Sequence, residues 1–111
     1  MMDVEKLFSD WRACIDDAAK SRADVIYLTE YRKSKKAILM NDARVEGFKT
    51  GQERESYAYA HQDYLDLLLA LKAATEKSEK FRWQMKIAEE RIGIYRTHEA
   101  SKRKEFTNYG N

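Results

Sequence analysis

The residues with the greatest capacity for chemistry are the two histidines and the single cysteine. His98 is followed by Glu99 but lacks the second histidine of a zinc-protease helix. His61 and Asp63 have a poor spacing for two ligands of one metal on a helix. Cys14 lies among apolar residues and is expected to pack as a small core side chain. We therefore expect a protein that is not an enzyme, with no catalytic residues, no metal site and no cofactor.

The middle of the chain contains the clearest breaks between elements. Gly47 and Gly51 are not followed by the Lys-Ser/Thr pair of a phosphate-binding loop, so we interpret them as a helix break. Thr50 and Glu53 match a capping box and predict that a helix begins after Thr50. Asp63 is expected to cap the next helix. The stretch 52–60 is then either a short separate helix or the start of the long one.

Composition indicates long helices. The chain has 111 residues, 36% of them charged, and no proline, which argues against a turn-rich β-sandwich or barrel. Its content of Ala, Glu, Lys, Leu and Arg is typical of helical proteins. A single cysteine excludes a disulfide framework within one chain. No apolar run approaches the roughly 18 residues of a membrane span, and no signal peptide is recognised, so we expect a cytoplasmic protein without membrane contact.

Two apolar repeats predict how the helices pack. In the C-terminal half, steps of three and four residues form the a/d seam of a coiled coil. The seam consists of Tyr57, Ala60, Tyr64, Leu67, Leu71, Ala74, Ser78, Phe81, Met85, Ala88, Ile92 and Tyr95. The N-terminal half carries a broader stripe. It consists of Val4, Leu7, Phe8, Trp11, Cys14, Ile15, Ala18, Val25, Leu28 and Leu39.

These patterns predict an all-α fold in a single domain, residues 1–111. Its architecture is a long antiparallel helical hairpin, coiled-coil-like, with a short connector helix. The expected elements are a helix over about 3–46 capped by Asp3, a connector over about 52–60, a helix over about 63–105, and a frayed tail over 106–111.

The hairpin alone offers limited burial. Two helices bury only one seam, and a chain of this size needs more apolar burial to be stable by itself. Large apolar side chains also lie away from the seam on the second long helix. They are Leu69, Trp83, Ile87 and Ile94. We expect this surface to bind a second copy of the chain or another protein, which predicts a homo-oligomer.

The charge distribution gives little support for nucleic-acid binding. Lys and Arg number 21 against 19 Asp and Glu. Basic residues of the C-terminal half are interpreted as a solvated face with pairs such as Glu79–Arg82, and weak DNA binding stays an alternative. They are Arg82, Lys86, Arg96, Lys102, Arg103 and Lys104. Tyr57 and Tyr64 are expected to pack in the seam, and the alternative interpretation is that their rings stack on the bases of a nucleic acid.

A set of short motifs covers about half of the chain. It comprises Arg54-Glu55-x-x-Ala58-Tyr59-Ala60, Tyr64, Phe81-Arg82-Trp83, Ala88-Glu89 and Tyr95-Arg96-Thr97-x-Glu99-Ala100-x-x-Arg103. The set resembles small uncharacterised helical proteins of tailed bacteriophages, often encoded near recombination or single-strand-annealing functions. That family often has a tryptophan at the position of Tyr95, and the N-terminal half matches it only in being helical. The resemblance implies the cytoplasm of a bacterial host and a context of DNA metabolism, and transfers no site residues.

Two functions follow as expectations. The first is a non-enzymatic phage accessory protein of DNA replication or recombination, which acts through protein contacts and weak DNA binding. The alternative is a phage-encoded inhibitor that binds and blocks a host defence or repair protein. The near-neutral charge and the exposed apolar residues favour protein contact over DNA contact.

Overall fold

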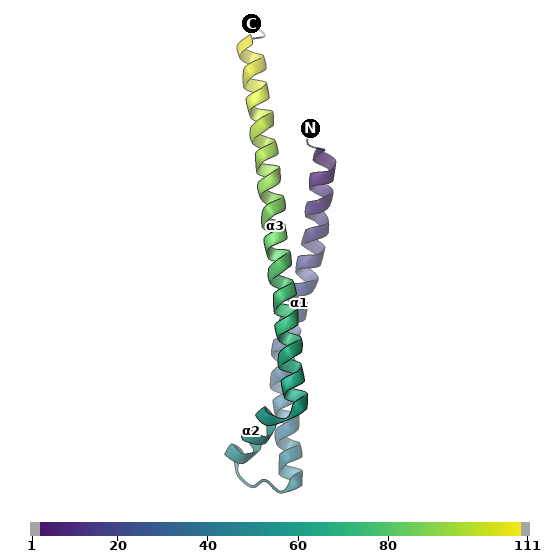
Figure 1. Cartoon of the computed structure of the whole chain (residues 1–111), viewed down its shortest axis with the longest axis vertical. Helices are drawn as coiled ribbons and strands as arrows, with labels where there is room; N and C mark the ends of the chain where they lie inside the picture. Colours follow the sequence, from purple (N-terminus) through teal and green to yellow (C-terminus); the bar gives the residue numbers. More distant parts are fainter. Residues whose placement is uncertain (1–2, 110–111) are drawn as a thin grey trace. The chain divides into compact units, whose positions relative to one another are not determined.

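The computed structural model describes residues 3–109, which form three α-helices and, within that range, no strand. Helix α1 spans Val4–Glu46, α2 spans Gly51–Ala60 and α3 spans Gln62–Tyr109 (Figure 1). The all-α helical hairpin predicted from the apolar repeats is confirmed, since the two long helices pack against each other. Asp3 caps α1 as expected, because its Oδ1 accepts a hydrogen bond from the Lys6 amide at 3.2 Å.

The break between α1 and α2 depends on one glycine. Gly47 has a φ of 103°, a left-handed conformation that glycine adopts without a Cβ clash. The Phe48 amide donates to the Ala43 carbonyl at 3.0 Å, which closes the helix end in a Schellman motif. Helix α2 then starts as predicted: the Thr50 hydroxyl accepts from the Glu53 amide at 3.1 Å. The Glu53 carboxylate reaches back to the Lys49 amide at 3.2 Å.

The junction between α2 and α3 differs from the expectation. His61 has extended backbone angles, so α2 is a separate helix. The cap of α3 is His61 and not Asp63, because the His61 Nδ1 accepts a hydrogen bond from the Asp63 amide at 3.0 Å. Asp63 lies two residues past the capping position, since α3 already begins at Gln62.

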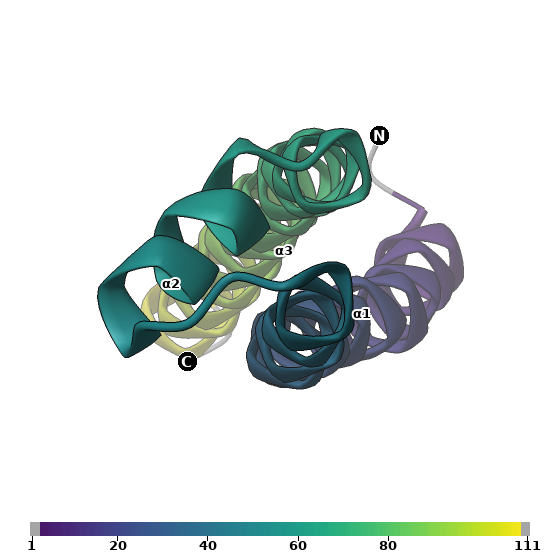
Figure 2. The same ribbon diagram turned by 90° about the horizontal axis from the view of Figure 1, so that it is seen from below.

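The chain divides into two units that each contain part of both long helices. The described part of unit 1 comprises residues 3–19 and 79–109, and unit 2 comprises Lys20–Ser78. Unit 2 includes α2, which lies beside the adjoining ends of α1 and α3 (Figure 2).

Unit 2 has the better-developed core. Leu39 of α1 and Ala58 of α2 are 1% and 0% exposed, and Tyr64 of α3 is 8% exposed. These three side chains, one from each helix, form a cluster against which Met40 and Leu68 pack. The small Ala58 lets α2 approach the long helices closely, so the short helix closes this end of the hairpin.

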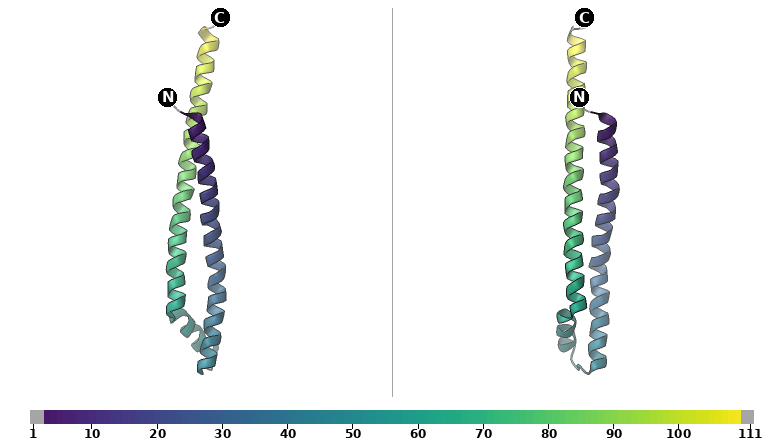
Figure 3. Two further views of the ribbon diagram at one scale, coloured as in Figure 1. Left: turned by 90° about the vertical axis from the view of Figure 1, so that its right-hand side faces the viewer. Right: turned by 45° about the vertical axis from the view of Figure 1, so that its right-hand side comes forward.

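Unit 1 consists only of paired segments of α1 and α3. Among its described residues, Ala88 and Ile92 are buried, while Leu7, Trp11, Phe81 and Met85 are half-buried. The last turns of α3 extend beyond the start of α1 (Figure 3), and all side chains from 100 to 107 are exposed.

The expectation of a frayed tail over 106–111 is wrong for residues 106–109, because α3 continues through Tyr109. No proline interrupts these turns, and the Thr107 hydroxyl donates to the Arg103 carbonyl at 2.9 Å. Residues 110–111 lie outside the described part of the chain.

Burial follows the predicted seam in α3. Every repeat position from Tyr64 to Tyr95 is buried or half-buried, whereas Ala60 of α2 is exposed. In α1 the burial follows the same rhythm and includes polar residues such as Ser21, Arg32 and Lys35, in addition to the expected apolar residues. Ile15 is the one member of the predicted stripe that is exposed. Both long helices therefore present a coiled-coil seam.

Candidate interaction surface

The four large apolar residues expected to bind a partner are all exposed. Leu69 is 63% exposed, Trp83 52%, Ile87 53% and Ile94 49%. Leu69 belongs to unit 2, and the other three belong to α3 in unit 1. Within unit 1 they serve two surfaces, because Ile87 and Ile94 border a groove while Trp83 lies in a cluster of cations.

The groove of unit 1 runs between the N-terminal turns of α1 and the facing turns of α3. It consists of two adjoining hollows of about 440 Å³ and 320 Å³. Both are lined by Leu7, Asp10 and Arg91. The first also contains Ala13, Cys14, Gln84, Ile87 and Ala88, and the second contains Asp3, Lys6 and Ile94.

The register of the two helices explains this groove. Leu7, Cys14 and Ala88 are seam residues, and Ala88 is too small to fill the space between the helices. Ile87 and Ile94 are seven residues apart, so they recur on the same side of α3 and form an apolar border. The groove thus has an apolar floor and a partly apolar wall that water covers in the single chain.

The charges of the groove are divided between its two walls. The wall from α1 carries Asp3 and Asp10 together with Lys6, and the wall from α3 carries Arg91. Acidic and basic groups therefore face the opening from opposite sides. A surface of mixed sign suits a protein partner better than a polyanion, because Asp3 and Asp10 repel phosphates.

The cluster around Trp83 is a second exposed feature of unit 1. Arg82 Cζ and Lys86 Nζ lie 5.5 Å and 5.4 Å from the Trp83 ring centroid, within the range of cation–π contacts. Arg82 also forms the predicted ion pair with Glu79 at 3.8 Å. The structure thus brings together two of the basic residues considered for DNA binding.

The remaining candidate basic residues lie farther along α3. Arg96, Lys102, Arg103 and Lys104 are all exposed residues of α3. Lys102 is paired with Glu99 at 3.6 Å. Ion pairs to neighbouring acids reduce the positive potential that these residues would offer to a phosphate backbone.

The polar groups of unit 2 hold the connector helix in place. Lys36 Nζ donates to Glu55 Oε1 at 2.9 Å and lies 4.8 Å from the centroid of the Tyr59 ring. Hydrogen bonding with Tyr59 and Glu55 raises the pKa of Lys36, and the hydrogen bond from Lys36 lowers the pKa of Glu55. Tyr59 in turn packs edge-on against Tyr64, with centroids 5.3 Å apart. These residues link α2 to both long helices.

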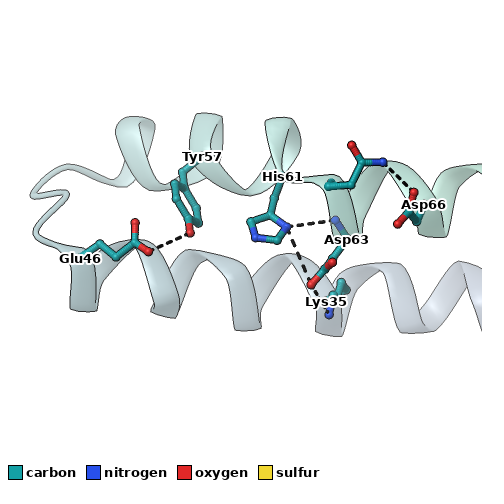
Figure 4. Close-up of polar contacts among 7 residues, drawn as sticks. Lys35, Glu46, Tyr57, His61, Asp63 and Asp66 are labelled. Carbon is teal, nitrogen blue, oxygen red and sulfur yellow. Dashed lines mark hydrogen bonds and ion pairs between the residues drawn. The ribbon is translucent and has the colours of Figure 1, made fainter.

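A second set of contacts joins the ends of α1 and α2 and the start of α3 (Figure 4). The Tyr57 hydroxyl donates to Glu46 Oε1 at 3.3 Å, and burial together with the Glu46 charge raises the pKa of Tyr57. Asp63 Oδ2 lies 3.5 Å from Lys35 Nζ and 3.9 Å from His61 Nδ1. His61 and Asp63 therefore have structural partners, and the described residues contain no group of three or more ligands suited to a metal ion.

Several residues of the groove were not predicted as site residues. Asp10, Ala13 and Arg91 lie beside the seam and not on it. The heptad pattern does contain a relevant indication, because residues flanking an a/d seam border the facing helix. Their roles become apparent only when the two repeats are aligned against each other.

Comparisons with known proteins place no further constraint on this surface. No protein-family model, curated protein or solved structure matches the chain. Among the described residues, no helix has the length and apolar character needed to cross a bilayer.

Proposed function

We propose that this protein is a non-enzymatic accessory factor that acts by presenting an exposed helical surface to another protein. The observation that carries the proposal is Trp83, a large aromatic side chain that is half exposed and has two cations against its ring. Tryptophan and arginine are the residue types most often found at the energetic centre of protein interfaces. We name Trp83, Arg82 and Lys86 the tryptophan face.

The setting proposed for this activity is phage DNA replication or recombination. The resemblance of Arg54–Arg103 to small phage proteins supports that setting. The tryptophan face supports a binding role, because its three residues lie outside the seam and add nothing to the core. Phage and host proteins that handle DNA are the partners considered, and inhibition of a host defence or repair protein is the alternative form of the same activity.

The decisive experiment is affinity capture with wild-type protein and two matched variants. Trp83→Ala removes the ring of the tryptophan face, and Leu69→Ala removes a side chain of similar exposure in unit 2. Capture from infected cells should be lost with Trp83→Ala and retained with Leu69→Ala. A partner encoded by the phage supports the accessory role, and a host partner captured from uninfected cells supports inhibition. Equal capture by all three proteins would contradict a role for this face.

Weak DNA binding is the second candidate, and the cation–π cluster is the observation that favours it. Aromatic rings beside cations stack with the bases of single strands. Fluorescence anisotropy with a labelled single-stranded oligonucleotide should show binding that falls steeply with salt. Lys86→Glu should reduce it more than Arg96→Glu, because Lys86 lies against Trp83. The absence of binding at low salt would leave protein contact as the function.

A further inference from the structure

We propose that the groove of unit 1 is occupied by a second copy of this chain. In this dimer, a two-fold axis places the α1 wall of each copy against the α3 wall of the other. None of the three residues of the tryptophan face lines the groove, so the inference does not depend on the proposed function.

Burial within unit 1 is the first reason. Only Ala88 and Ile92 are buried among its described residues, although both helices continue their seam through it. Ile87 and Ile94 remain half exposed beside a groove whose floor is apolar. A second pair of helices laid on this side would remove both isoleucines from water, as the neighbouring pair does in a four-helix bundle.

Charge complementarity selects a second copy as the occupant. A two-fold interface presents the same surface twice, so the surface must complement its own rotated image. The groove meets this condition because its α1 wall carries two acids, Asp3 and Asp10, against one base, Lys6, and its α3 wall carries Arg91. Pairing α1 with α3 across the axis brings Asp10 of each copy opposite Arg91 of the other, whereas pairing α1 with α1 would oppose the two Asp10 carboxylates.

Side-chain size agrees with this arrangement. Ala13 is a small, exposed residue on the α1 wall, and Ile87 is a large one on the α3 wall of the same hollow. When the α1 wall of one copy meets the α3 wall of the other, Ala13 provides space for Ile87. Two α3 walls facing each other would instead oppose bulky isoleucines without such a space.

The test uses two charge-reversal variants. Each variant should fail to form a dimer by itself, and the two should form a dimer with each other. Asp10→Arg gives a chain with arginine at both positions, and Arg91→Asp gives a chain with aspartate at both. Light scattering after size exclusion should give twice the 13.1 kDa chain mass for the wild type and the single chain mass for each variant. An equimolar mixture of the two variants should return to the dimer mass, because both cross-axis pairs are restored. Circular dichroism confirms that each variant is helical.

Within each variant chain, positions 10 and 91 carry like charges, and mixing does not change this. Recovery of the dimer in the mixture therefore reports contacts between copies and not contacts within one chain. A wild type that is monomeric at tens of micromolar would overturn the proposal. So would a mixture that stays at the single chain mass, or single variants that remain dimers.

A second measurement does not depend on charge. In a Cys14→Ser background, Ala13→Cys is made in one chain and Ile87→Cys in another, so that each chain has a single thiol. Mild oxidation of the mixture should give a disulfide-linked heterodimer in higher yield than either variant alone. As a control, Leu69→Cys in place of Ile87→Cys should give no such excess. Equal yields with the two positions would contradict the proposed pairing.

Discussion

The two units use the same helix-pairing pattern but differ in what completes it. In unit 2, α2 supplies Ala58 to a cluster with Leu39 and Tyr64, and all three side chains are buried. In unit 1, the same two long helices meet without a third element, and the groove beside Ala88 stays open to solvent. A two-helix seam is thus sufficient for pairing, and a further helix is needed to enclose a core.

This difference suggests where stability and binding reside in the chain. The enclosed core of unit 2 should contribute most of the free energy of unfolding, because buried apolar area is the main stabilising contribution. Unit 1 retains exposed apolar surface, which is the property of a region that associates with another molecule. Substitutions in each unit test whether stability and binding are divided in this way.

The largest effect is expected from Leu39→Ala. Leu39 is almost completely buried in unit 2, and deletion of a buried leucine costs roughly 2–5 kcal/mol of unfolding free energy. Met85→Ala at a half-buried seam position of unit 1 should cost less. Urea denaturation followed by circular dichroism measures both, with the exposed Ile38→Ala as a control near zero. A greater loss for Met85→Ala would reverse the assignment of the main core to unit 2.

Replacing two glycines by alanine should have smaller effects on stability, and the two effects should have opposite signs. Gly47→Ala places a Cβ on a residue with a φ of 103°, so it should destabilise the protein by about 1–2 kcal/mol. Gly93 lies within α3 in unit 1, and a Cβ added there meets no atom within 4 Å. Gly93→Ala should therefore stabilise by about 0.5–1 kcal/mol. Thermal melts of the two variants measure the difference, and destabilisation by Gly93→Ala would indicate that unit 1 is packed too tightly around Gly93 to accept a methyl group.

The sequence predicted the regular parts of the fold well for physical reasons. Apolar residues at steps of three and four encode the α3 seam directly, and Thr50 and Gly47 have side-chain and backbone preferences that act locally. The α1 seam was harder to follow because Arg32 and Lys35 occupy it. Lys35 is accommodated by the Asp63 carboxylate at 3.5 Å, which is a partner from another helix.

The groove was less predictable than the helices. Ile87 and Ile94 could be identified as apolar residues away from the seam, but their relation to Asp10 and Ala13 depends on the register between α1 and α3. A periodic pattern determines which side of a helix packs, and it leaves open how far one helix slides along the other. The cap of α3 was mistaken for a similar reason, because His61 is placed by the end of α2.

The smallest effect is expected from the ion pair that holds α2 in unit 2. Lys36 lowers the pKa of Glu55 below its ordinary value of 4.5, so the folded state binds fewer protons there than the unfolded state. The contribution of this pair to stability is therefore fully present above that ordinary value and is lost as the pH falls through the lower, folded pKa. Because both side chains are still partly open to water, solvent screens the pair and the loss should be slight.

Urea midpoints measured from pH 6 down to pH 3 should fall more steeply for the wild type than for Glu55→Gln, which cannot titrate at this position. Glu53→Gln provides the control, because Glu53 carries a cap of α2 rather than the contact to α1. Unit 1 contains no part of this pair, so dimer formation by the groove should be unchanged in Glu55→Gln. Identical acid profiles for the wild type and Glu55→Gln would show that the connector helix is held by its other contacts, chiefly the Leu39, Ala58 and Tyr64 cluster, and not by this ion pair.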